Sequence, residues 1–152
     1  MTATYPQAED EMFQLAQDAW DAGAPAIVGY TPELRFEGRE STLKPINDRY
    51  WARVSVSPVG EGQATLSDCV AVAGQKRYEN VGNVFVQIFA LMTDELGAEK
   101  ARLLADLMKN AFRGKTTPSA CWFKNCRFNK LANENKFFRY NVVAEYEFQE
   151  IG

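Results

Sequence analysis

The chain has 152 residues, 46% of them hydrophobic and 24% charged, with a formal net charge of -3. This length and balance are typical of one globular domain that buries a proper core. No residue is a histidine, so the chain lacks the usual general base near neutral pH and the commonest metal ligand. A Ser–His or Cys–His nucleophile pair is therefore excluded within the chain, and we expect no cofactor, no metal and no catalytic residues.

The chain shows no signal for a membrane or for secretion. No apolar run approaches the roughly 20 residues that span a bilayer, and residues 1–6 lack the basic and apolar segments of a signal peptide. Three cysteines without such a signal argue against a disulfide framework. Cys121 and Cys126 lie five positions apart, which on a strand predicts opposite faces and so no shared metal. We expect a protein that is made and kept in a cytoplasm.

Apolar residues at helical spacing predict a first helix over residues 6–22. Thr4 stands just before it as a candidate N-cap. Gly23 is predicted to end the helix, and Pro25 to keep it from continuing. Residues 26–28 are then predicted to form a short strand.

Short strands are predicted through the middle of the chain. Alternating apolar and polar residues indicate one-sided strands at residues 34–36 and 51–57. Glycine and proline predict a turn at residues 58–62. Residues 63–73 are predicted to be another strand, which leads into a hairpin tip at residues 74–76.

The segment from Arg77 to Ala90 is predicted to be a central strand, because it is apolar on both faces. The residues on one side are Val84, Val86 and Ile88, and those on the other are Phe85 and Phe89. Such a strand belongs in a sheet that is covered on both faces. The covering can come from the chain itself or from a neighbouring subunit.

An apolar stripe predicts a second helix from about Ala98 to Phe112, followed by two long strands at about residues 117–129 and 136–149. The polar residues between these strands predict an antiparallel hairpin. The order of the elements indicates an α+β fold. We expect a single domain over residues 1–152, with a mostly antiparallel, mixed sheet of about four to six strands and two main helices packed on it.

Charge is distributed unevenly along the chain. The acidic residues of the first helix region are Glu9, Asp10, Glu11, Asp18 and Asp21, and no basic residue precedes Arg35. The basic residues from 109 to 139 are Lys109, Arg113, Lys115, Lys124, Arg127, Lys130, Lys136 and Arg139, against Glu134 alone. Such asymmetry indicates nucleic-acid contact or complementary faces between subunits. Two solvated surfaces would produce the same pattern.

Two patterns of side chains suggest other chemistry. Glu145 and Glu147 share one face of the last strand, with carboxyl groups roughly 7 Å apart, which is within the range of an inverting glycosidase pair. Alternating acids are more commonly the solvated face of a strand. Residues 122–140 interleave aromatic and basic side chains, which can stack on bases and pair with phosphates. We favour core aromatics with a basic rim, because an amphipathic hairpin needs such a face.

Four segments in order resemble the tail-terminator (tail-tube completion) proteins of long-tailed bacteriophages and prophages. They are RYENVGNVFVQIFA, a helix with ARLLADLMKNAF, then CWFKNCRFNKL and FFRYNVVAEYEFQEI. The resemblance runs from about Trp51 to Ile151, with the first helix in the expected place. Each segment is a packing pattern and not a chemical signature, so the resemblance depends on their order and spacing together.

The resemblance implies a structural virion protein that forms a ring of six copies. The ring would cap the finished tail tube, end its growth and present a surface for joining the head. The implied partners are further copies of the chain, the major tail-tube protein and a head-completion or connector protein. DNA would pass through the lumen without sequence-specific binding, and no membrane is involved. The implied location is the host bacterial cytoplasm during assembly and then the virion tail.

The hairpin around Gly74, Lys76, Arg77 and Tyr78 is the predicted subunit interface, because a polar tip is followed at once by an apolar strand. Reversing the charges of Lys76 and Arg77 should then impair ring formation. Three alternatives stay open. They are another ring-forming phage neck or head-completion protein, a small DNA-binding module that uses the basic hairpin, and a small enzyme that uses Glu145 and Glu147.

Overall fold

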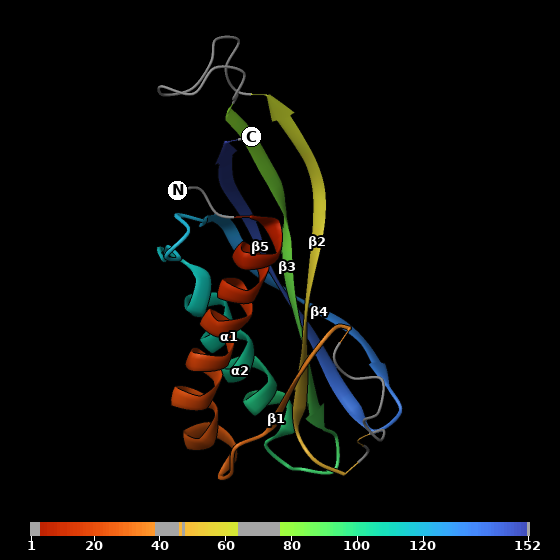
Figure 1. Cartoon of the computed structure of the whole chain (residues 1–152). Helices are drawn as coiled ribbons and strands as arrows, with labels where there is room; N and C mark the ends of the chain where they lie inside the picture. The colour runs from red at the N-terminus through yellow and green to blue at the C-terminus, as the bar shows by residue number, and fades with distance from the viewer. Residues whose placement is uncertain (1–3, 39–45, 47, 64–76, 152) are drawn as a thin grey trace.

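The structure, a computed structural model, describes residues 4–38, 46, 48–63 and 77–151. Figure 1 shows the helices α1 (Tyr5–Val28) and α2 (Gly97–Phe112) beside a sheet. The strands are β1 (Glu33–Phe36), β2 (Trp51–Gln63), β3 (Arg77–Leu91), β4 (Trp122–Glu134) and β5 (Phe137–Ile151). Across the described residues these five form one sheet in the order β1-β2-β3-β5-β4. The β1–β2 pair is parallel and the other pairs are antiparallel, which confirms the predicted α+β fold with a mixed sheet.

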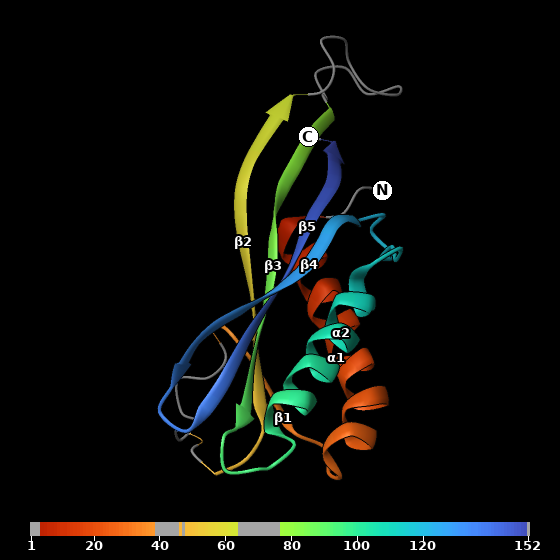
Figure 2. The ribbon, with the colours of Figure 1, turned by 180° about the vertical axis from the view of Figure 1, so that it is seen from behind.

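Both helices pack on the same face of the sheet, with α1 toward β1 and β2, and α2 over β3, β5 and β4 (Figure 1 and Figure 2). The main core lies between the helices and this face. β3 contributes Val84, Val86 and Ile88, which are at most 1% exposed. The same core includes five residues of β5, which are Tyr140, Val142, Ala144, Tyr146 and Phe148. A period of two on the strands and 3.6 on the helices brings these apolar faces together.

The opposite face of the sheet has a smaller apolar cluster of its own. Trp51 stacks on Phe89 with ring centroids 4.1 Å apart, and Phe137 meets Phe89 edge-on at 5.8 Å. Asn135, at the β4–β5 turn, lines a hollow together with these rings and with Arg35 of β1. The twisted sheet therefore brings the hairpin back toward β1. At the C-terminal end of β3, this aromatic cluster covers the sheet face that points away from the helices. The chain itself therefore supplies the predicted covering of that face there.

Helix α1 continues past its predicted end. Gly23 and Pro25, which were expected to stop it, lie inside it, and the expected strand at residues 26–28 is its last turn. Gly29 ends the helix instead, with a φ of 96° and its N–H donating to the Pro25 carbonyl at 2.8 Å. Proline removes one helical hydrogen bond. Packing of the last turn against the core outweighs that loss.

Gly23 has a reason in packing rather than in helix termination. A Cβ at this position would lie 2.5 Å from Cδ1 of Leu107 in α2. Glycine therefore lets the two helices approach closely. A sequence pattern shows the glycine but not the Leu107 side chain that packs beside it.

Strand β2 is also longer than predicted. Residues 58–62, expected to form a turn, pair with β3 instead. A β-bulge between Pro58 and Gly60 shifts the register there, and bulges are among the places where a sheet tolerates proline. The expected strand at residues 63–73 lies outside the described residues except for Gln63, which ends β2. The expected tip at residues 74–76 lies outside them altogether.

A bulge in β4 corrects the prediction for two cysteines. The register against β5 shifts between Lys124 and Arg127, where Asn125 has a φ of 52°. The extra residue inverts the alternation of the strand. Cys121 and Cys126 therefore both contact the core on the helix side, not opposite faces. Both thiols are free, and burial raises the pKa of the Cys121 thiol to about 12.

Candidate assembly surfaces

One end of the sheet extends beyond the first turn of α1 (Figure 1). β1 pairs only with residues 51–54 of β2, and β4 reaches only Glu147 of β5. Among the described residues, this end therefore consists of β2, β3 and β5. Its two outer strands are the second half of β2, where Val59 is 69% exposed, and the last residues of β5. We call this part of the sheet, residues 57–63, 77–82 and 148–151, the projecting end.

Two of the four predicted interface residues are described, and both lie on the projecting end. Arg77 is exposed and begins β3, and Tyr78 is half-buried and pairs in register with Glu150 of β5. Gly74 and Lys76 lie outside the described residues. Contact between this end and a neighbouring subunit stays a prediction.

The exposed side of α1 is acidic. Asp18 and Asp21 are both exposed and point away from the core. Their hydrogen bonds come from neutral amides one turn earlier, from Gln14 Nε2 to Asp18 at 2.7 Å and from Gln17 Nε2 to Asp21 at 2.9 Å. Among the described residues, no cation forms an ion pair with either carboxylate. The charge of these two side chains is therefore not neutralised by an ion pair within the described residues.

Glu11 does not belong to this acidic side, although it lies in the same helix. Its carboxylate accepts hydrogen bonds from the backbone N–H and the hydroxyl of Ser119, each at 2.7 Å. These bonds fasten α1 to the loop that leads into β4. The sequence pattern could not separate Glu11 from the other acidic residues of the helix, because its partner Ser119 is distant in sequence and is brought close only by folding.

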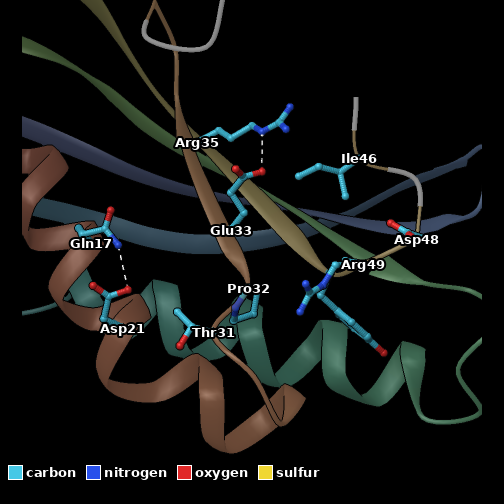
Figure 3. A pocket seen from close by; sticks show the side chains of 10 residues that line it. Gln17, Asp21, Thr31, Pro32, Glu33, Arg35, Ile46, Asp48 and Arg49 are labelled. Carbon is cyan, nitrogen blue, oxygen red and sulfur yellow. Dashed lines mark hydrogen bonds and ion pairs between the residues drawn. The ribbon is translucent and has the colours of Figure 1, made fainter. Parts of the chain in front are cut away.

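A hollow of about 550 Å³ lies beside Asp21, between α1 and the segment that contains β1 (Figure 3). Three carboxylates line it, those of Asp21, Glu33 and Asp48, together with the guanidinium groups of Arg35 and Arg49. Arg35 Nε donates to Glu33 at 2.9 Å. The name acidic side is used below for Asp18, Asp21, Glu33 and Asp48. Its residues come from α1, β1 and the segment before β2.

The C-terminal end of α2 and the edge strand β4 are basic. Lys109 Nζ lies 5.4 Å from the ring centroid of Phe128. Burial raises the pKa of the Cys126 thiol, and the nearby charges of Arg113, Arg127 and Lys109 act in the opposite direction. Three basic residues, from the last turn of α2, its C-cap and β4, thus act on one thiol.

The described part of the chain neutralises only some of this basic charge by ion pairs. Lys109 pairs with Asp106 at 3.1 Å, and Arg127 pairs with Glu145 at 3.1 Å. Arg113 and Lys130 are exposed, and no carboxylate in the described part of the chain forms an ion pair with either. The name basic side is used below for Lys109, Arg113, Arg127 and Lys130.

Glu145 and Glu147 each bond with residues of the neighbouring strand β4. Lys124 Nζ donates to Glu147 at 3.3 Å, and Arg127 donates to Glu145 at 3.1 Å. Asn125 also donates to Glu145. Antiparallel pairing of β4 with β5 brings these opposite charges together. The Glu145 and Glu147 side chains are 32% and 17% exposed, so this strand face is less solvated than the sequence pattern predicts.

A hydrogen-bond network that the sequence analysis missed lies at the start of α2. Asp94 accepts from Tyr50 Oη at 2.6 Å, from Lys100 Nζ at 2.8 Å and from the backbone N–H of Leu96 at 3.0 Å. The N–H of Tyr50 donates to Tyr30 Oη at 2.9 Å. The bond from Lys100, and then that from Tyr50, lowers the pKa of Asp94 to about 2. An aspartate shortly before a helix was the available signal, but its tyrosine partner comes from the segment before β2.

Within the described ranges, no group of three or more cysteine, aspartate and glutamate side chains is placed to hold a metal ion. No helix there is both long enough and apolar enough to cross a bilayer.

Comparison with known proteins identifies the fold. No protein-family model matches the chain, and no curated protein matches it. One similar solved structure is a protein without a descriptive name, which is 13% identical, with 93% of this chain and 96% of that chain covered and a TM-score of 0.59. Another is a chain from the virion of a native gene transfer agent (GTA) particle, which is 17% identical, with 97% and 100% covered and a TM-score of 0.55. At these identities the likeness shows a shared fold alone.

Proposed function

We propose that this protein is a structural component of a phage-like virion, in which a ring of six copies caps the tail tube and ends its growth. The observation that supports this best is the fold shared with a chain of the GTA virion, over 97% of this chain and 100% of that one. The resemblance of the sequence to tail-terminator proteins points to the same class. The protein would assemble in the host bacterial cytoplasm and remain in the virion tail.

The surfaces of the chain support an assembly role. Among the described residues, no strand pairs with the outer edge of β2 beyond Val54, and a neighbouring copy is one way to cover such an edge. In the last strand, the carboxylates of Glu145 and Glu147 form ion pairs with Arg127 and Lys124 of the neighbouring strand β4. Partners of the ring would be the major tail-tube protein on one side and a head-completion protein on the other.

The direct test is to polymerise the tail-tube protein encoded nearby with and without this protein, and to image the tubes by negative-stain electron microscopy. The proposal expects tubes of limited length that have an additional ring at one end. A tube protein from an unrelated phage serves as the control, because its end should stay bare.

Two results would contradict the proposal. Unchanged tubes together with binding to the isolated head-connector protein would favour a neck protein of the head side. Unchanged tubes together with DNA binding that weakens steeply with salt would favour a nucleic-acid-binding module.

A further inference from the structure

The two oppositely charged surfaces lie on opposite sides of the domain. In Figure 1 helix α1 lies in front of α2, and in the opposite view of Figure 2 helix α2 and strand β4 lie in front. Asp18 and Asp21 are on the exposed side of α1, whereas Arg113 follows the last residue of α2 and Lys130 is in β4. Folding therefore converts a charge asymmetry along the sequence into one across the molecule.

Each side keeps charge that the described residues do not neutralise. Asp18 and Asp21 receive hydrogen bonds from neutral glutamine amides, and Arg113 and Lys130 have no carboxylate partner among the described residues. Like-charged groups on one surface repel a second copy of that surface. A symmetric contact of either side with itself is therefore unfavourable, and a contact between the two different sides is favourable.

β4 is an edge strand, but its edge is poorly suited to extend the sheet. It is interrupted by bulges between Lys124 and Arg127 and between Leu131 and Glu134, and bulges and basic side chains are features that block edge-to-edge pairing. Side chains, not backbone hydrogen bonds, are then the groups available for contact on this side. On the acidic side, the hollow beside Asp21 provides a concave surface that a neighbouring side chain can enter (Figure 3).

We infer that the acidic side of one copy, centred on Asp18 and Asp21, binds the basic side of the next copy, centred on Arg113 and Lys130. This contact joins two different patches, so repetition produces a head-to-tail chain of subunits that closes as a ring. The inference rests on the proposed ring and names the surfaces that form it. Because exposed charges contribute, the association weakens as salt rises.

Reciprocal charge reversal tests this contact. Variant A has Asp18→Lys and Asp21→Lys, and variant B has Arg113→Glu and Lys130→Glu. In A positions 18, 21, 113 and 130 are all basic and in B they are all acidic, so each variant should assemble at a concentration about tenfold or more above that of the parent protein. An equal mixture of A and B, and a variant with all four changes, should both recover assembly. Sedimentation velocity at low and high ionic strength measures these states.

Matched variants separate charge from folding. Glu95→Lys with Glu99→Lys changes net charge as variant A does, but lies before and in the first turn of α2, and should assemble like the parent. Circular dichroism melting checks that every variant is folded. Should A or B unfold, the neutral pair Asp18→Asn with Asp21→Asn provides the same comparison with a smaller expected shift.

Cross-linking reports the contact directly even when association is weak. A carbodiimide joins a carboxylate to an amine with loss of water, so it should link Asp18 or Asp21 of one copy to Lys130 of another. Mixing ¹⁵N-labelled and unlabelled protein identifies links between copies by mass spectrometry. No such link, in solution or on capped tubes, together with assembly that is insensitive to variants A and B, would overturn the inference.

The outcomes distinguish this contact from the proposed function. If the tubes are capped and variants A and B assemble like the parent protein, the tube-capping role is supported and the proposed contact is wrong. The alternative result is that variants A and B each fail to assemble, their mixture recovers assembly, and the tube ends stay bare. That result supports the proposed contact and contradicts the tube-capping role.

Discussion

At the scale of single residues, Asp94 connects segments of the fold that no sequence motif linked to one another. Its carboxylate joins the segment before β2 through Tyr50 and the first turns of α2 through Leu96 and Lys100. Charge-assisted hydrogen bonds of this kind are stronger than neutral ones. Asp94 therefore stabilises the junction between the strands and the second helix.

Asp94→Asn should lower the melting temperature at neutral pH, because the amide cannot accept both charged and hydroxyl donors as the carboxylate does. The pKa of Asp94 is lowered from 3.8 to about 2, so the stabilisation is fully present above the unfolded-state pKa and is lost as pH falls through about 2. The difference between the parent and the variant should therefore shrink in this range. Thermal unfolding followed by circular dichroism measures it.

Glu95→Gln is the control for this change, because Glu95 is an exposed neighbour in the same loop. It should leave both the melting temperature and its pH dependence nearly unchanged. Equal effects of the two variants would show that the Asp94 network does not stabilise the fold.

At the scale of elements, the pairing of β2, β3 and β5 depends on a glycine. A Cβ at Gly82 of β3 would lie 2.5 Å from the backbone carbonyl oxygen of Ser57 in β2 and 2.5 Å from Tyr146 Oη in β5. A backbone atom cannot move aside as a flexible side chain can. In contrast, a Cβ at Gly60 of β2 meets nothing within 4 Å.

Gly82→Ala should lower the free energy of unfolding by about 1–3 kcal/mol, because the added methyl group overpacks the sheet. Gly60→Ala, the matched control in the neighbouring strand, should stay within about 0.5 kcal/mol of the parent. Denaturant unfolding measures both values. If the two variants are equally stable, the close approach of these three strands is wrong.

At the scale of the whole molecule, the described helices cover one face of the sheet and reach only the start of the projecting end, where Tyr5 of α1 meets Phe148 (Figure 1). This end includes Arg77 and Tyr78, which begin β3. An uncovered sheet end is a surface on which a neighbouring copy can pack. The acidic and basic sides lie along the body of the domain, so the two kinds of contact use different surfaces.

Lys76→Glu with Arg77→Glu should impair assembly, because the change reverses charge at the proposed contact of the projecting end. We expect about a tenfold rise in the concentration needed for assembly, measured by sedimentation velocity. Arg102→Glu with Lys136→Glu makes the same charge change in α2 and before β5, and it should assemble like the parent. If the variant with Lys76→Glu and Arg77→Glu assembles like the parent, the hairpin predicted around these residues is not part of the interface.

The sequence alone determined the α+β class, the central strand, the second helix and the terminal hairpin. These follow from hydrophobic period and turn chemistry, which are local properties. It also showed the separation of acidic from basic residues along the chain. Local signals failed at Pro25 and Pro58, where helix α1 and strand β2 continue because distant partners pack against them.

Only the tertiary structure decided which surfaces these residues share. The bulge at Asn125 placed Cys121 and Cys126 against one core, and the twist of the sheet brought the β4–β5 turn toward β1. The same packing set the acidic side of α1 and the basic side of β4 on opposite sides of the domain (Figure 1 and Figure 2). The physical reason is that sequence spacing specifies the faces of an element, whereas contacts between elements specify where each face points.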